Sequence, residues 1–147
     1  MTQLPEKAAS QGSVQYINPD DLPKNPAYTN VIVVTGCVKT IYIGAQVAWD
    51  DAASGTIIGK GDIRAQTEQV LKYIDSALRT SGAQREHVIK LTIYVVQGQP
   101  IGPGVAAFRA WWGNRPNPPA NTVIFIPELV PADFLVAIEA IAVVPEG

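Results

Sequence analysis

Residues 62–96 read DIRAQTEQVLKYIDSALRTSGAQREHVIKLTIYVV, and this stretch decides the fold. Asp62 suits the residue before a helix, because its carboxylate can accept hydrogen bonds from the free amides of the first turn. Apolar residues then recur at helical spacing and form one stripe. They are Ile63, Val70, Leu71, Ile74, Ala77 and Leu78. Gly82 suits the left-handed residue that commonly follows a helix, so the pattern predicts a helix over residues 63–81 and a strand over 87–96.

Three apolar, β-branched segments before this stretch predict further strands. They lie at residues 14–17, 31–35 and 40–47. Gly36 and Cys37 separate the second segment from the third, and this spacing predicts that the two pair as a hairpin. Residues 1–12 are polar and show no pattern, so we expect them to form a mobile tail.

One short helix and two strands are predicted after the central stretch. The helix covers residues 105–112 and ends before Gly113, and the strands cover residues 122–126 and 134–144. The element order is therefore β, β, β, α, β, α, β, β. This order predicts the α+β class, with a single mixed sheet covered on one face by both helices. A chain of 147 residues fits one domain, which we place at residues 13–147.

The composition argues against several classes of function. The net charge is −2, and the eleven Lys and Arg residues are scattered, so no nucleic-acid partner is expected. One cysteine, Cys37, and one histidine, His87, offer no disulfide and no His- or Cys-rich metal site. We expect no metal and no cofactor. No signal peptide is visible, and no apolar run reaches the roughly 20 residues that span a bilayer. A cytoplasmic protein without a membrane partner is expected.

Five ordered segments resemble successive signatures of the reactive intermediate deaminase family, also called the Rid or YjgF family. They are IYIGAQVAWD at 41–50, QTEQVLKYIDSAL at 66–78, VIKLTIYVV at 88–96, RPNPPANTV at 115–123 and LVAIEAIAVV at 135–144. The resemblance implies a chorismate-mutase-like fold and a homotrimer with a central barrel of sheets. It also implies small-molecule clefts between subunits and metal-independent hydrolysis of imines or enamines. The chain has more apolar strand than two helices can cover, which also favours a homotrimer.

Two positions depart from the residues that carry the family's best-known chemistry. Family members that act on amino-acid-derived imines have arginine in a Pro-Ala-Arg motif, and the motif here ends in Asn121. An arginine binds a carboxylate through two parallel charged hydrogen bonds, whereas an asparagine carries no charge. The family's water-activating glutamate begins a Glu-Ile-Glu segment, and Ala137 stands at that position here. Activity on substrates such as 2-iminopropionate is therefore expected to be weak or absent.

Seven residues are candidates for the ligand cleft. The substrate-binding candidates are Tyr28, Gln46, Asn121, Trp49 and Arg115, and the catalytic candidates are Glu128 and Glu139. Tyr28 matches a family tyrosine that lines the cleft, and a packed loop aromatic is the equal alternative. The alternative for Gln46 is a buried amide that satisfies backbone groups. Trp49, together with one of Trp111 and Trp112, would favour an aromatic or apolar ligand.

The charged candidates each have a plainer alternative. Arg115 is a candidate for the missing cation and Glu128 for the missing carboxylate, and an exposed surface charge is the alternative for both. Glu139 lies on the same side of its strand as Ala137, at a distance of roughly 7 Å. An unpaired carboxylate in so apolar a strand would be costly. Glu139 must therefore have a partner, contact water in a cleft, or have a raised pKa that suits proton transfer. A structural ion pair is its alternative role.

Two functions remain in competition. The first is a small-molecule hydrolase or deaminase whose substrate is not a simple amino-acid-derived imine. The alternative is a non-catalytic paralogue of the same fold that binds a small ligand. An RNA-cleaving function comes third, because the chain has no basic patch and no pair of histidines.

Overall fold

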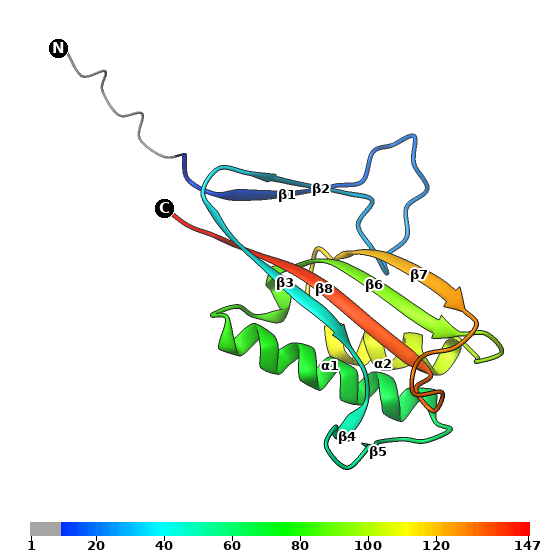
Figure 1. Ribbon diagram of the computed structural model, residues 1–147. Coiled ribbons are helices and arrows are strands. Elements are labelled where there is room, and N and C mark those ends of the chain that lie inside the picture. The colour runs from blue at the N-terminus through cyan, green and yellow to red at the C-terminus, as the bar shows by residue number, and fades with distance from the viewer. Residues whose placement is uncertain (1–9) are drawn as a thin grey trace, which may run out of the picture.

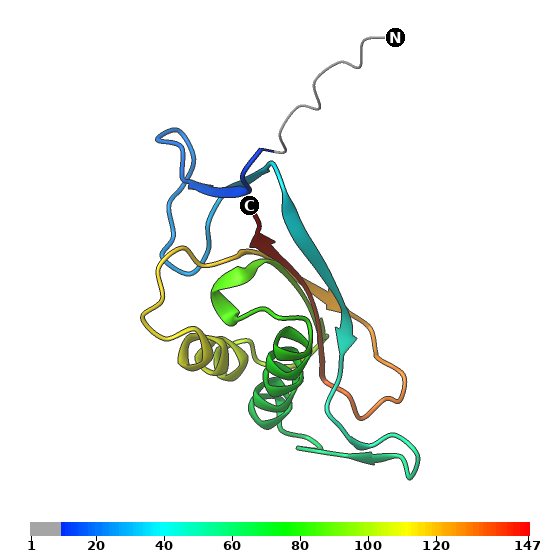
Figure 2. The same cartoon turned by 90° about the vertical axis from the view of Figure 1, so that its left-hand side faces the viewer.

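The computed structural model describes residues 10–147 and shows a four-stranded sheet backed by two helices (Figure 1). The strand order across the sheet is β3 (Val38–Gln46), β8 (Val136–Pro145), β6 (Val88–Val96) and β7 (Ala120–Ile126). Strand β8 runs antiparallel to both of its neighbours, and β7 runs parallel to β6, so the sheet is mixed. Helices α1 (Ile63–Thr80) and α2 (Gly102–Trp112) lie on the same face (Figure 2), which confirms the predicted α+β class.

Two short ribbons lie outside this sheet. Strand β1 (Ser13–Ile17) pairs antiparallel with β2 (Val31–Thr35), and β4 (Trp49–Asp51) pairs antiparallel with β5 (Thr56–Ile57). The prediction of one sheet that contains every strand is therefore too simple. The four long strands form it, and the β1–β2 ribbon projects beyond it (Figure 1).

The predicted hairpin between residues 31–35 and 40–47 is wrong. Strand β2 pairs with β1, and β3 pairs with β8. The backbone of Cys37, between β2 and β3, is engaged elsewhere. Its amide donates to Ser10 and its carbonyl accepts from Glu146, each at 2.9 Å. These bonds tie the connection to two other segments of the chain, so it does not close as a tight turn.

The predicted mobile tail, residues 1–12, ends in three described residues that belong to the folded part. Gln11 forms a bridge with Cys37, and the amide of Gly12 donates to the Glu146 carbonyl at 2.9 Å. A Cβ atom at Gly12 would lie 1.9 Å from the Cys37 carbonyl oxygen, so only glycine fits at this close approach. The remainder of the predicted tail lies outside the described residues.

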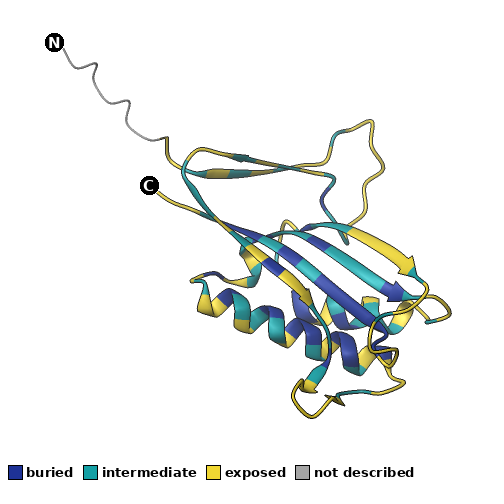
Figure 3. Ribbon diagram, viewed as in Figure 1, coloured by how far each residue is buried: buried dark blue, intermediate teal, exposed yellow. Residues whose placement is uncertain are grey.

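Helix α1 begins and ends as the sequence predicts. The Asp62 carboxylate accepts from the amide of Ala65 at 3.1 Å, and Gly82 follows the helix with φ +74°. The buried side of the helix carries Ile63, Gln66, Thr67, Val70, Leu71, Ile74 and Leu78. The predicted apolar stripe is confirmed, and it contains two polar residues, Gln66 and Thr67. Buried residues concentrate here and in β8 (Figure 3).

Helix α2 starts before the predicted position at residue 105. Pro103 lies in its first turn, where proline is tolerated because that amide has no partner within the helix. The helix ends at Gly113, as predicted, with a positive φ of 66°. No helix in residues 10–147 is both long enough and apolar enough to cross a membrane.

Candidate functional site

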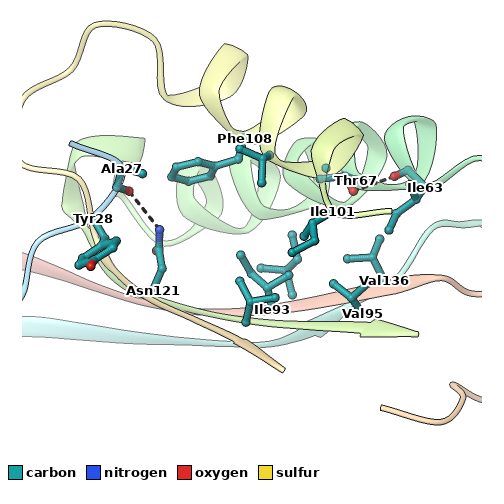
Figure 4. Close-up of a pocket in the computed structure, with 14 residues that line it drawn as sticks. Ala27, Tyr28, Ile63, Thr67, Ile93, Val95, Ile101, Phe108, Asn121 and Val136 are labelled. Atoms are coloured by element: carbon teal, nitrogen blue, oxygen red, sulfur yellow. Dashed lines mark hydrogen bonds between the residues drawn. The ribbon is translucent and has the colours of Figure 1, made fainter. Parts of the chain in front are cut away.

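A cavity of about 280 Å³ lies between the two helices and the sheet (Figure 4). Its walls come from α1, α2, β6, β7 and β8, and from the loop before β2. None of the 14 described residues that line it has a side chain charged at neutral pH. Only Tyr28, Thr67 and Asn121 contribute polar side chains. A few polar groups in an otherwise apolar hollow are typical of small-molecule sites.

The loop before β2 brings Tyr28 to the mouth of this cavity. The next residue, Thr29, is only 2% exposed and fixes the loop in place. Its hydroxyl donates to the carbonyl of Pro118 at 2.5 Å, and its amide donates to the carbonyl of Pro119 at 3.5 Å. The proline-dense segment before β7 therefore holds Tyr28 near the start of that strand, where Asn121 lies.

Asn121 faces the helices from strand β7. Its register partner on β6 is Leu91, a fully buried core residue, so both side chains lie on the helix-covered face. The amide nitrogen of Asn121 donates to the carbonyl of Ala27 at 3.3 Å. The amide oxygen is buried and has no hydrogen-bond partner among the described residues. Such an acceptor costs about 1–3 kcal/mol if it stays unpaired.

The structure brings Tyr28 and Asn121 to one cavity, as the sequence predicts for a ligand site. It also adds residues that the sequence did not single out, among them Thr67 of α1 and Phe108 of α2. The hydroxyl of Thr67 donates to the carbonyl of Ile63 at 2.7 Å. The position of Thr67 on the apolar stripe of α1 was the one signal that could have identified it.

Glu139 lies on the other face of the sheet from this cavity. Its neighbour in sequence, Ile138, lines the cavity, and adjacent strand residues point to opposite faces. The Glu139 carboxylate accepts from the hydroxyl of Tyr94 at 2.9 Å. This hydrogen bond raises the pKa of Tyr94, because the carboxylate favours the protonated phenol. Within residues 10–147, the partner of Glu139 is thus a tyrosine, and the side chain makes no ion pair.

Gln46 and Trp49 lie toward the opposite edge of the sheet. Gln46 lines a separate hollow between β3 and α1, and its side-chain amide donates to the carbonyl of Gly44 at 3.1 Å. Trp49 packs edge-on against Phe134 with 4.8 Å between the ring centroids. The carbonyl of Trp49 also accepts a hydrogen bond from the hydroxyl of Tyr73. Neither side chain reaches the Asn121 cavity in its own chain.

Arg115 and Glu128 are also outside the cavity. The guanidinium of Arg115 donates to the carboxylate of Glu86 and to the carbonyl of Trp112, so it closes the C-terminal end of α2. The same hydrogen bond from Arg115 lowers the pKa of Glu86. Glu128 is exposed in the loop between β7 and β8 and makes no ion pair within residues 10–147. Among the described residues, the predicted cation Arg115 is thus already paired, whereas the predicted acid Glu128 has no ion-pair partner.

Trp111 and Trp112 are both buried in the core, and neither lines the Asn121 cavity. In the single chain, Phe108 of the same helix lines this cavity, and a role for either tryptophan at a cleft or interface between subunits stays a prediction. Within the described residues, no group of three or more His, Cys, Asp or Glu side chains could hold a metal ion. The roles of Gln46, Trp49, Arg115, Glu128 and Glu139 at a cleft between subunits stay predictions.

Comparisons with known proteins agree with the fold. The family model described as endoribonuclease L-PSP matches residues 21–144. A RutC family protein of Pyrococcus horikoshii is 33% identical over 102 residues, covering 69% of this chain and 77% of the relative. The 2-iminobutanoate/2-iminopropanoate deaminase of Rattus norvegicus is 27% identical over 118 residues, covering 80% of each chain. A solved structure of a Rid-family protein of unknown function from Yersinia pestis is 31% identical. It has a TM-score of 0.76 and covers 89% of this chain and 98% of its own.

Proposed function

Because the chain belongs to the endoribonuclease L-PSP family, the family of the Rid (YjgF) proteins, we propose that it is a metal-independent hydrolase of the deaminase type. Its proposed substrate is an imine or enamine other than the simple amino-acid-derived ones. The observation that carries the proposal is the uncharged cavity that joins Tyr28 and Asn121. A substrate carboxylate would find no cation there, and burying an unpaired charge is very costly.

The proposed reaction makes modest demands on the site. Water adds its oxygen to the imine carbon, the carbon–nitrogen bond breaks, and ammonia leaves while a carbonyl compound remains. The imine carbon is already electrophilic, so positioning can supply much of the acceleration. In this proposal the Asn121 amide oxygen accepts a hydrogen bond from the substrate nitrogen or the attacking water, and the Tyr28 hydroxyl orients the same group. Glu128 or Glu139 of a neighbouring subunit is the candidate proton acceptor, since neither reaches the cavity of its own chain.

The proposed assembly is a homotrimer around a central barrel of sheets. Val136 and Ile138 face the helices, so the opposite face of the sheet is the one that the helices leave uncovered (Figure 2). On that face, Tyr42 is 78% exposed. Edge strand β7 adds three exposed apolar residues, Val123, Ile124 and Phe125. Apolar groups gathered on an uncovered face and an open edge favour self-association.

Light scattering at micromolar concentration is expected to give three times the mass of the chain. Tyr42→Asp is expected to shift the protein toward monomer, because it places a charge on the face proposed to be covered. Circular dichroism would verify that the variant remains folded. A parent protein that stays monomeric across the concentration range would contradict the trimer and remove the cleft between subunits.

Ammonia release from 2-iminopropionate is expected to be at least tenfold slower than with the rat relative, measured side by side. The loss of a charged hydrogen-bonded pair costs about 1.5–3 kcal/mol, before the missing glutamate is counted. An uncharged imine with an apolar substituent should release ammonia faster than 2-iminopropionate from this protein. Equal rates for the two enzymes on 2-iminopropionate would refute the proposed substrate preference.

The double variant Asn121→Arg with Ala137→Glu tests whether the two missing family residues explain the expected low activity on 2-iminopropionate. Restoring both family residues is expected to raise activity on 2-iminopropionate. The two positions lie on opposite faces of the sheet in one chain, because Asn121 pairs with Leu91 and Ala137 with Tyr94. A gain that needs both substitutions would therefore support a site shared between subunits. No gain would show that the cleft differs elsewhere as well.

The second candidate function is ligand binding without chemistry. The observation that favours it is the absence of any acid or base, apart from the Tyr28 hydroxyl, among the described residues that line the cavity. Binding of a neutral ligand without ammonia release across a panel of uncharged imines would establish this alternative.

A further inference from the structure

We propose that the ligand of the Asn121 cavity is an uncharged molecule of about one ring that donates an N–H or O–H hydrogen bond to the Asn121 amide oxygen. Asn121 would then select ligands by the presence of that donor. This inference rests on the proposed function, which takes this cavity as the working site. It goes further by specifying the chemistry that the ligand must present.

The donor requirement follows from the orientation of the Asn121 amide. The nearest fixed partner is the carbonyl oxygen of Ala27, which can only accept, so the amide nitrogen must face it. The reversed amide would set two oxygens against each other. The amide oxygen is thereby left buried and without a partner among the described residues. A ligand that donates to it removes the cost of an unpaired acceptor, whereas a ligand without a donor keeps that cost.

The other two polar side chains agree with this assignment. The hydroxyl hydrogen of Thr67 is committed to the Ile63 carbonyl, so Thr67 can only accept from a ligand. The Tyr28 hydroxyl makes no hydrogen bond to other described residues and can either donate or accept. Asn121 and Tyr28 lie at one end of the cavity, and Ile101 and Val136 lie toward the other (Figure 4). The ligand should therefore have one polar end and one apolar end.

The size and charge of the ligand are also limited. The cavity volume of about 280 Å³ lies just below the range for small-molecule sites, which begins near 300 Å³. Phe108 and the aliphatic side chains around it favour a flat apolar group over a polar one. No described lining residue carries a charge that could compensate an ionised ligand. A single ring with one neutral donor meets all of these conditions.

Three matched probes test the inference by calorimetry or ligand-observed NMR on the assembled protein. Benzamide is neutral and donates, N,N-dimethylbenzamide is neutral and cannot donate, and benzoate is charged. We expect benzamide to bind about tenfold more tightly than N,N-dimethylbenzamide, the effect of one hydrogen bond. Benzoate is expected to bind most weakly. This order of affinities is measured on the unmodified protein, so misfolding of a variant cannot affect the result.

Asn121→Leu is expected to bring benzamide down to the affinity of N,N-dimethylbenzamide, because leucine has a similar size and no acceptor. Gln69→Leu is the matched control, since it removes a half-buried amide of α1 that lies outside the cavity and should leave the order unchanged. Benzoate that binds as tightly as benzamide, equal affinity of the two amides, or no benzamide binding at millimolar concentration would each overturn the inference.

Ammonia release is measured separately, because it tests the proposed function and not the ligand preference. The expected binding order without turnover would sink the hydrolase proposal alone, and turnover without the order would sink this inference alone.

Discussion

Gln66→Met is expected to lower the free energy of unfolding by about 3 kcal/mol. Gln66 is fully buried within the apolar stripe of α1. Its amide nitrogen donates to the carbonyls of Gly59 and Asp133 at 3.2 and 2.9 Å, and its amide oxygen accepts from the Leu135 amide at 2.8 Å. Methionine has a similar length and leaves all three backbone groups without this partner.

The test is denaturant unfolding followed by tryptophan fluorescence at a fixed protein concentration, since association shifts apparent stability. Gln69→Met is the matched control, because Gln69 is on the same helix, is only half-buried and makes no side-chain hydrogen bond to a described residue. Its effect should stay within about 0.5 kcal/mol. A loss below about 1 kcal/mol for Gln66→Met would show that water or other groups replace its bonds.

The contrast between Gln66 and Gln46 shows what a sequence can predict about a buried amide. The sequence favoured Gln46 as the amide that satisfies backbone groups, and in the structure Gln46 makes one such bond, to Gly44. Gln66 makes three. It lies three residues after Ile63 and four before Val70, so its place on the buried stripe was readable from periodicity. Its partners were not, because two of them, Asp133 and Leu135, are distant in sequence.

Contacts between residues distant in sequence also limited the prediction of the fold. Helix α1 was predicted almost to its last residue, since caps and periodicity act within a few positions. The pairing of β3 was wrong, because its partner is β8, and register pairs such as Ile41 with Ala142 connect distant parts of the chain. Local patterns identify a strand but do not choose between two apolar partners.

The candidate site residues lie on different faces of the sheet. Sequence alternation correctly places Ala137 and Glu139 on one side of β8. It does not say which side the helices cover, and that choice separates Glu139 from Asn121 within the chain. Tyr28 was placed by resemblance to family members, and its position beside Asn121 depends on Thr29, which bonds to Pro118 from a distant loop. The sequence therefore named Tyr28 and Asn121, but not the loop contacts that bring them to one cavity.

Asp75→Leu is expected to lower the free energy of unfolding by about 3 kcal/mol, because it removes one partner of a largely buried ion pair. The Asp75 carboxylate accepts two hydrogen bonds from Arg85, at 2.8 and 2.7 Å, and one from the Trp111 indole at 3.0 Å. The side chains of Asp75 and Arg85 are only 18% and 32% exposed. The hydrogen bond that Arg85 donates to the Asp75 carboxylate is the main reason that the pKa of Arg85 is raised.

The matched control for this prediction is Asp20→Leu. Asp20 pairs with Lys24 at 3.0 Å, and both side chains are largely exposed, so its removal should cost less than about 0.5 kcal/mol. A double-mutant cycle of Asp75→Leu with Arg85→Met would isolate the coupling between the two side chains. If Asp75→Leu and Asp20→Leu lowered the free energy of unfolding equally, the Asp75–Arg85 pair would contribute no more stability than an exposed surface pair.

The Asp75 cluster also predicts an effect on the cavity, although Asp75 does not line it. Helix α2 has 11 residues, and a helix so short is marginal without tertiary contacts. Its last turn is tied to α1 through Trp111 and Asp75, while Phe108, one turn earlier, forms part of the cavity wall. We therefore expect Asp75→Leu to weaken benzamide binding severalfold under conditions in which the variant is still folded, and Asp20→Leu to leave it unchanged. Unchanged binding by a destabilised Asp75→Leu protein would mean that the apolar contacts of Phe108 alone hold this wall in place.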